Sequence, residues 1–294
     1  MGAIDVWAQL PNERFMAQPW LATLLRWTGK AGDLRAPALS EMLDAMDEGG
    51  VDIAFLSAWC GPDGWLITNA EVALAVNEAP QRLYGLLSVD LGDPMGAVRT
   101  IREYAGNPAF VGVRVVPWLW DLPPNDRRYY PVYAACVDTG LPFCTQIGHT
   151  GPLCRSEPGR PIPYLDDVLL DFPELVVVGG HVGFPWIDEV LSLARKYPNF
   201  YIDTSAYTVA RLPSQLIAFM RGEGAGRVMF GTNWPMISPR DCLAALGRLD
   251  PDDRARALFL EGAARRVFKL SESPSGQVAG TDPASRIMTA SARS

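Results

Sequence analysis

The chain contains only two histidines among its 294 residues, and both occur where proton transfer would be useful. His149 lies in the sequence GHTG and His181 in the sequence GHVG, each just after a short apolar run typical of a β-strand. An imidazole titrates close to neutral pH, so it can take up and return a proton with only a modest shift of its pKa. A lone histidine is more often structural, but finding both at strand ends predicts catalytic roles for them.

Other polar groups occupy the ends of further strand-like runs. Three amides could donate N–H groups to a substrate carbonyl or an enolate-like oxyanion. These amides are Gln9, Gln146 and Asn233. Arg114 lies within a strand-like run, where it could pair with a carboxylate, polarise a carbonyl, or form a buried structural ion pair. We expect Asp203 to orient His181 or close a structural network, and Asp5 to be structural.

Large aromatic side chains gather in the same regions and suit a flat aromatic or hydrophobic acyl substrate. Several of them could instead simply cap the strands. The predicted substrate-binding residues are Trp7, Gln9, Trp59, Trp118, Trp120, Gln146, Tyr207 and Trp234. Basic groups in segments 121–128 and 155–160 could take a carboxylate or the phosphates of a carrier thioester such as coenzyme A. Solvated loop charge is the simpler explanation for them.

The elements that position these residues alternate between an apolar strand and an amphipathic helix. Strands are predicted at 3–7, 51–57, 83–89, 110–116, 141–146, 175–178, 200–203 and 228–231. Helices are predicted at 38–48, 69–78, 95–104, 130–138, 164–170, 186–195, 212–221, 240–248 and 252–268. Eight repeats favour an α/β fold of the (β/α)8 TIM-barrel type, in which chemistry gathers at the carboxyl ends of the strands. No Gly-rich dinucleotide loop follows an early strand, which weakens the open-sheet alternative.

Composition limits the classes of partner. Apolar residues make up 48% of the chain and charged residues 20%, a balance typical of a globular protein. The net charge of −7, without a basic cluster, disfavours nucleic acid. No apolar run is long enough for a membrane span and no export signal begins the chain, so we expect a cytoplasmic protein. Five scattered cysteines indicate free thiols. We expect a single barrel domain over residues 1–270 and a flexible tail at 271–294.

Several segments resemble the amidohydrolase-related family, which includes decarboxylases and hydrolases of aromatic and cyclic carboxylates. They are IDVWAQ at 4–9, GHVGFPWIDE at 180–189, NFYIDTS at 199–205 and FGTNWP at 230–235. Together they span most of residues 3–270. The resemblance implies a TIM barrel that acts on a small aromatic or acyl substrate; a homo-oligomer is compatible with it.

The resemblance also implies metal ligands that this chain lacks. Family members carry two histidines at the end of the first strand, where this chain has Trp7 and Gln9. The family's strand-five histidine aligns with Gln146, and its strand-eight aspartate with Asn233. Tryptophan cannot ligate a metal, and amides are weak neutral donors. We therefore predict a site that needs no cofactor. The alternative is a weakly held zinc or manganese ion, with His149 and His181 as its ligands.

Three functions remain open. The segment FCTQIGHTG at 143–151 resembles a subgroup that hydrolyses 4-hydroxyphenyl-β-ketoacyl-CoA thioesters. The leading hypothesis is a metal-independent hydrolase that cleaves a carbon–carbon bond in such an aromatic or cyclic β-keto acyl substrate. The second is a metal-dependent, non-oxidative decarboxylase of a hydroxylated aromatic acid. The third is a barrel that binds a ligand without turning it over.

Overall fold

The strands form a parallel barrel. The computed structural model describes residues 2–27, 29, 35–249 and 253–270. The barrel strands follow chain order: β1 (Ala3–Ala8), β2 (Val51–Ser57), β5 (Leu83–Leu87), β6 (Phe110–Val115), β7 (Phe143–Gln146), β8 (Val177–Gly180), β9 (Phe200–Asp203) and β10 (Val228–Met229). The Val6 amide donates to the Phe230 carbonyl at 3.0 Å and the Asn233 amide to the Trp7 carbonyl at 2.8 Å, which joins the first strand to the last. The predicted (β/α)8 TIM-barrel fold is confirmed.

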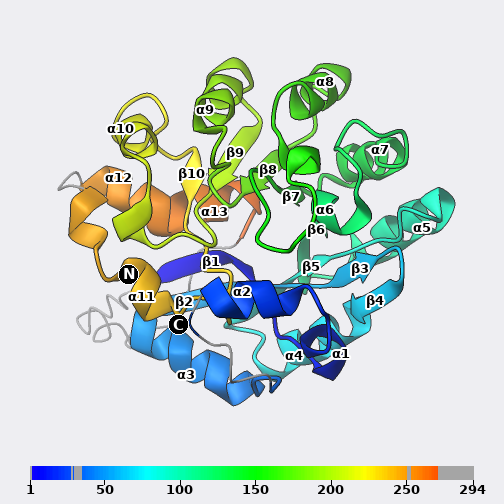
Figure 1. The fold of residues 1–294 in the computed structure, drawn as a ribbon, viewed down its shortest axis with the longest axis horizontal. Helices are drawn as coiled ribbons and strands as arrows, with labels where there is room; N and C mark the ends of the chain where they lie inside the picture. The colour runs from blue at the N-terminus through cyan, green and yellow to red at the C-terminus, as the bar shows by residue number, and fades with distance from the viewer. Residues whose placement is uncertain (1, 28, 30–34, 250–252, 271–294) are drawn as a thin grey trace, which may run out of the picture.

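Helices surround the strands, because strands buried on both faces need an outer apolar layer. Figure 1 shows α7 to α10 along one side of the barrel and α3 and α4 on the opposite side. The main helices are α3 (Leu39–Gly49), α4 (Asn69–Glu78), α5 (Pro94–Tyr104), α7 (Tyr130–Thr139), α8 (Tyr164–Asp171), α9 (Ile187–Lys196) and α10 (Ser214–Arg221). Shorter helices are α11 (Pro239–Leu243), α12 (Asp253–Ala257) and α13 (Ala263–Val267).

The barrel interior is filled at the amino-terminal end of the strands. Inward-facing side chains such as Ile4, Val6 and Phe55 form one buried cluster with residues of α13. The rings of Phe55 and Phe268 lie edge to face with centroids 4.8 Å apart. These packed side chains fill the amino-terminal end of the barrel, so a cavity is expected at the carboxyl-terminal end of the strands.

Several elements differ from the sequence predictions, and the fifth barrel strand begins at Phe143, two residues later than predicted. The sixth barrel strand likewise begins two residues late, at Val177. Trp59 lies in a hairpin of β3 (Trp59–Gly61) and β4 (Gly64–Ile67), and the loop after β6 begins with α6 (Pro117–Trp120). Segment 252–268 is divided between α12, a π-helical turn over Leu258–Gly262, and α13. The predicted tail at 271–294 lies outside the described residues.

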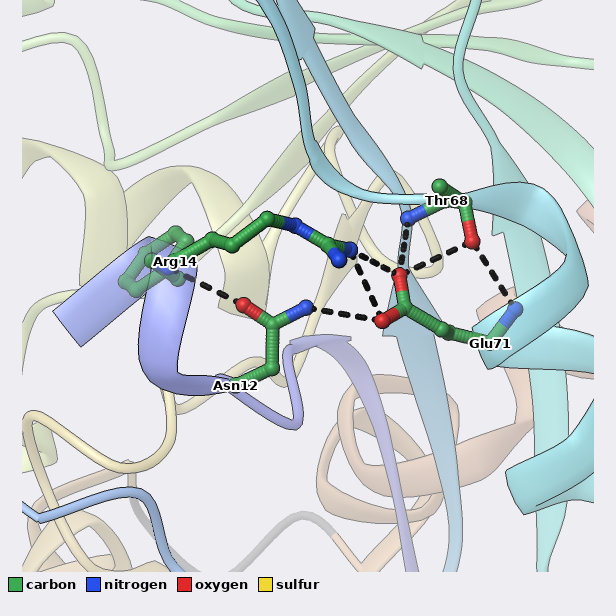
Figure 2. A network of polar contacts seen from close by, with 5 residues as sticks. Asn12, Arg14, Thr68 and Glu71 are labelled. Atoms are coloured by element: carbon green, nitrogen blue, oxygen red, sulfur yellow. Dashed lines mark hydrogen bonds and ion pairs between the residues drawn. The ribbon is translucent and has the colours of Figure 1, made fainter. Parts of the chain in front are cut away.

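The segment after β1 contains two helices without a sequence prediction, α1 (Glu13–Met16) and α2 (Leu21–Trp27). Figure 2 shows how α1 is tied to α4 through the carboxylate of Glu71. Arg14 pairs with Glu71 at 2.6 Å, and the Asn12 amide donates to the same carboxylate at 3.0 Å. Glu71 also completes the amino-terminal cap of α4 with Thr68. This network holds in place a segment that covers one side of the barrel mouth.

Within the described part of the chain, no helix is long and apolar enough to cross a membrane. The five cysteines are free; Cys154 is exposed and the others are buried.

Candidate active site

A cavity of about 230 Å³ opens at the carboxyl ends of the strands. One part of its wall is apolar, and the other carries the imidazoles, amides and a guanidinium. The apolar part consists of Phe15, Trp20, Leu21, Leu24, Trp59, Trp118, Met236 and Ile237. The polar part includes Gln9, Gln146, His149, Thr150, His181, Tyr207, Arg211 and Asn233. For scale, a dry cavity of about 150 Å³ accommodates benzene, so this one has room for a substituted ring.

The apolar wall is an aromatic cluster from three separate loops. Phe15 meets Trp20 and Trp59 edge to face, with centroids 5.3 and 5.2 Å away. Trp20 and Trp59 are stacked at 6.2 Å, and Trp20 meets Trp118 edge to face at 5.1 Å. Such mutually packed rings form a continuous aromatic surface along this part of the cavity. The wall therefore suits a planar ring.

The polar wall contains a hydrogen-bonded chain that ends at an imidazole. Nδ1 of His181 lies 2.7 Å from Oγ of Ser205, and that hydroxyl donates to Oδ1 of Asp203. The Ser205 backbone amide also donates to Oδ1 of Asp203, at 2.9 Å. Because the serine proton is directed to Asp203, the serine oxygen accepts from Nδ1–H of His181. Nε2 of His181 then carries a lone pair, which is the state required of a proton acceptor.

Burial keeps this imidazole neutral. Desolvation, aided by the positive charge of Arg114 and by His149, lowers the pKa of His181 to about 3. Burial raises the pKa of Asp203, while its hydrogen bonds with Ser205 and the charge of Arg114 oppose that rise. His149 is exposed at the rim, and its Nδ1 lies 2.9 Å from the Thr150 carbonyl. The protein atoms around its ring still exclude part of the solvent, and this desolvation lowers the pKa of His149. Both imidazoles are therefore neutral at physiological pH.

The side-chain amides of Gln9, Gln146 and Asn233 differ in whether their N–H groups remain free to bind a ligand. Nε2 of Gln9 donates to Oδ1 of Asn233 at 3.2 Å and to the Trp234 carbonyl. Gln146 accepts from the Trp118 indole at 2.7 Å and donates to the His149 carbonyl at 3.3 Å. The N–H groups of both glutamines are thus partly used by the protein. Nδ2 of Asn233 has no such bond within the described residues, so Asn233 is the amide best able to bind a carbonyl oxygen.

Arg114 lies beneath the cavity rather than in its wall. Arg114 is 1% exposed, and the central carbon of its guanidinium sits 3.4 Å from the centroid of the Trp7 ring, a cation–π contact. Its three nitrogens have no hydrogen-bond partner within the described residues. The expected contact of Arg114 with a substrate is therefore corrected, because Trp7 covers it. The alternative of a direct ion pair is not seen either, although Asp203 and Asp5 are near enough to raise its pKa.

Asp5 links the first barrel strand, β1, to the loop after the last strand, β10. Its carboxylate accepts from the backbone amides of Trp7 at 3.0 Å and Thr232 at 2.9 Å, and from the Thr232 hydroxyl. Burial raises the pKa of Asp5 to about 7, against the opposing effect of these hydrogen bonds. This placement agrees with the structural role expected for it.

Comparison with known proteins now identifies the family. A family model described as "Amidohydrolase" matches residues 5–270. The chain belongs to the amidohydrolase family. No curated protein matches this amidohydrolase in a sequence comparison.

Solved structures agree with the barrel. A TIM-barrel protein from Bordetella bronchiseptica is 25% identical with a TM-score of 0.78; the match covers 92% of this chain and 99% of that one. A dihydroxybenzoic acid decarboxylase from Polaromonas, with bound manganese and 2-nitroresorcinol, is 18% identical with a TM-score of 0.69, covering 92% and 98%. A probable 2-pyrone-4,6-dicarboxylic acid hydrolase from Acinetobacter baumannii is 18% identical with a TM-score of 0.63, covering 92% and 100%. The last two likenesses show the fold alone.

The residues of this amidohydrolase do not fit a divalent ion of the kind held by the manganese-bound neighbour. The indole of Trp7 lies against His181 with ring centroids 4.7 Å apart, and it has a guanidinium on its face. A side chain at Gly180 would overlap with that indole, so the ring fills the space between β1 and β8. Over the described residues, no three His, Cys, Asp or Glu side chains come together as a metal site. A cation next to Arg114 would also be repelled.

The structure brings together most, but not all, of the predicted site. Eight predicted residues line the cavity: Gln9, Trp59, Trp118, Gln146, His149, His181, Tyr207 and Asn233. Asp203 reaches it only through Ser205. Three predicted substrate-binding tryptophans do not line the cavity, which corrects that prediction. Trp7 is buried, the Trp120 indole donates to the Cys60 carbonyl at 3.1 Å, and Trp234 lines a separate small cavity.

Sequence reasoning missed several residues that line or support the cavity, among them Phe15, Trp20, Arg211 and Ser205. Phe15 and Trp20 belong to the segment after β1, which has no long periodic pattern. Arg211 lies at the end of a short 3-10 helix, Val209–Arg211, in the loop after β9. For Ser205, the available signal was its position two residues after Asp203 at a strand end.

Proposed function

We propose that this amidohydrolase is a hydrolase that cleaves a carbon–carbon bond beside a ketone in a one-ring aromatic or cyclic substrate, without a bound metal. The observation that carries the proposal is the Asp203–Ser205–His181 chain, which presents a neutral imidazole to an aromatic-walled cavity. An aromatic β-keto acyl compound, either as the free acid or as a thioester, is the substrate class we favour.

The site supplies a role for each step of such a reaction. The substrate ring packs on Trp20, Trp59 and Trp118, and Nδ2 of Asn233 donates to the ketone oxygen. Nε2 of His181 takes a proton from water as the water oxygen bonds to the ketone carbon. Collapse of the tetrahedral intermediate breaks the carbon–carbon bond and expels an enolate, which takes the proton back from the imidazolium.

The low pKa of His181 sets a condition on this scheme. An imidazole with a pKa of about 3 is a weak base in the empty site. The oxyanion of the tetrahedral intermediate places a negative charge beside it, which favours the protonated form. Proton transfer therefore becomes favourable only as the oxyanion develops, so that water is activated in the transition state rather than beforehand.

Paired histidine variants test the proposal. In assays with aromatic diketo acids and β-keto thioesters, His181→Gln should lower kcat by on the order of 10²-fold or more, since it removes the proton acceptor. His149→Gln, at the exposed rim, should change kcat less. Undiminished kcat in His181→Gln would refute the proposed role. Binding without turnover of any such compound would favour a ligand-binding barrel.

A non-oxidative decarboxylase is the second candidate, because a similar fold occurs in a manganese-bound dihydroxybenzoic acid decarboxylase. The described side chains around Trp7 lack the ligands that a divalent ion needs, which argues against a metal-dependent decarboxylase. Turnover by protein treated with a chelator separates the two functions. Loss of activity on chelation, with recovery on adding manganese, would favour the decarboxylase; unchanged hydrolysis would favour the metal-independent site.

A further inference from the structure

The cavity carries an unpaired positive charge in a wall without carboxylates. Arg211 is exposed and lines the cavity, whereas no Asp or Glu of the described residues does so. Across the described chain, Arg211 makes no side-chain ion pair or hydrogen bond. The protein as a whole has a net charge of −7, so a free guanidinium at a cavity without acidic side chains is not a general property of its surface.

The same loop positions this guanidinium and the proton-accepting chain. Ser205 lies six residues before Arg211, between β9 and the 3-10 helix Val209–Arg211. The Arg211 amide donates to the Thr208 carbonyl at 2.8 Å, and the Arg248 guanidinium donates to the Ala210 carbonyl. The backbone that presents Arg211 is thus fixed from two sides. A group bound there would hold a defined position relative to His181.

Three arginines of segments 121–128 and 155–160 have acidic partners outside the cavity. Arg128 pairs with Asp126 at 3.0 Å and Arg160 with Glu189 at 2.7 Å. Arg155 lies 3.7 Å from Asp121. None of these arginines lines the cavity. Within the described residues, segments 121–128 and 155–160 therefore contribute no arginine to the cavity wall, whereas Arg211 belongs to it.

We propose that Arg211 binds a free carboxylate of the substrate other than the reacting group, so that the site selects a small aromatic or cyclic keto acid over neutral analogues and carrier thioesters. A guanidinium binds a carboxylate through paired N–H donors, and the absence of acidic side chains among the described lining residues spares that anion repulsion. The cavity of about 230 Å³ holds a ring with a short acidic side chain. The choice of reacting carbonyl rests on the proposed function, but the binding of the acid does not.

Ligand binding without turnover tests this proposal. Phenylacetate and phenylacetamide share a ring and differ in charge, and the cavity tryptophans report binding by fluorescence quenching. Wild-type protein should bind phenylacetate about tenfold more tightly than the amide, equivalent to about 1.4 kcal/mol. Arg211→Gln should abolish this difference, and Arg211→Lys should retain most of it. Arg155→Gln, whose side chain lies outside the cavity wall, is the matched control and should behave as wild type.

The outcomes separate this proposal from the proposed function. Equal or absent binding of the two probes, or a preference that survives in Arg211→Gln, would overturn it. Coenzyme A displacing phenylacetate at lower concentration than a free aromatic acid does would assign the cation to phosphate instead, and would overturn it too. His181→Gln should keep the preference for the acid while losing turnover, so failure of the catalytic scheme leaves this result unaffected.

Discussion

The two sides of the cavity are built from different parts of the barrel. The aromatic rings of the apolar side come from the segments after β1, β2 and β6, which contribute Phe15, Trp20, Trp59 and Trp118. The polar side comes mainly from the loops after β7 to β10, which contribute the imidazoles, Asn233 and Arg211. The barrel thus separates ring binding from proton transfer around its circumference.

The two sides are also held in different ways. Ring contacts and the Glu71 network fix the apolar side. The polar side depends on backbone held in the left-handed region, with φ of 71° at His181, 64° at Val182 and 69° at Asn233. Each such residue costs about 1–3 kcal/mol, and such strain is concentrated at functional sites. Changes to the apolar side should therefore affect stability first, and changes to the polar side should affect kcat first.

Trp59→Ala should give the largest effect on stability. The ring is buried against Phe15, Trp20 and Trp118, and removing a buried Trp typically costs about 3–5 kcal/mol. Urea unfolding would measure the loss. Trp65→Ala in the same hairpin is the control, since that ring is 36% exposed and should change the free energy of unfolding far less. Equal losses in the two variants would contradict a packed apolar wall.

Ser205→Ala should show the opposite pattern. The substitution removes the hydroxyl between His181 and Asp203, so Nδ1–H of His181 loses its acceptor and Nε2 is no longer held as the free base. We expect kcat to fall on the order of 10²-fold, with a small change in KM. Ser205→Thr, which keeps a hydroxyl, should recover part of the activity. A rise in KM alone, with kcat retained, would place Ser205 among the ligand contacts instead.

The barrel could be predicted from the sequence because its strands and helices are strongly patterned. The strand at 51–57 and the helix at 69–78 appear in the structure as β2 and α4. The hairpin at Trp59 was missed although Pro62-Asp63-Gly64 is a turn sequence, because it interrupts an expected β-strand to α-helix connection. Helices α1 and α2 are short, and their places depend on tertiary contacts such as those of Glu71.

The polar side of the cavity was predictable in part, because strand ends of a barrel converge. That rule found His149, His181 and Asn233, all of which line the cavity. It failed for Trp7 and Arg114, since strand alternation gives the inward direction but not the depth at which a side chain stops. Trp7 covers Arg114, and only the packing at Gly180 shows this.

His181 and Asp5 have pKa values shifted in opposite directions. Their contributions to the pH dependence of the free energy of unfolding should nearly cancel between about pH 4 and 6.5. The pKa of His181 is about 3 in the folded chain and 6.5 in the unfolded chain. Between these values the unfolded chain binds an extra proton, so stability falls as the pH drops below 6.5. The folded pKa of Asp5 is about 7 against 3.8, so the folded chain keeps a proton and stability falls as the pH rises above 3.8. The two slopes cancel in the shared range.

Single substitutions should expose each slope. Relative to wild type, Asp5→Asn leaves the His181 contribution, so the free energy of unfolding should rise by about 1.4 kcal/mol per pH unit from pH 4.5 to 6. His181→Gln should give a slope of opposite sign. Urea unfolding at several pH values measures both. Parallel profiles for wild type and both variants would show that these groups titrate normally in the folded protein.

Glu71→Gln should have the smallest effect, and it tests whether the α1 network supports the apolar wall. The Arg14 ion pair is exposed, so it is worth little, whereas the cap of α4 and the bond from Asn12 add to it. We expect a loss of about 1 kcal/mol in the free energy of unfolding, with weaker binding of aromatic ligands and unchanged kcat. Asp138→Asn, which breaks the exposed Arg102 pair far from the cavity, is the control and should leave ligand binding unchanged. Weaker binding in Glu71→Gln alone would show that a surface network positions Phe15 and its neighbours, whereas equal binding in both variants would mean that ring packing alone holds the apolar side.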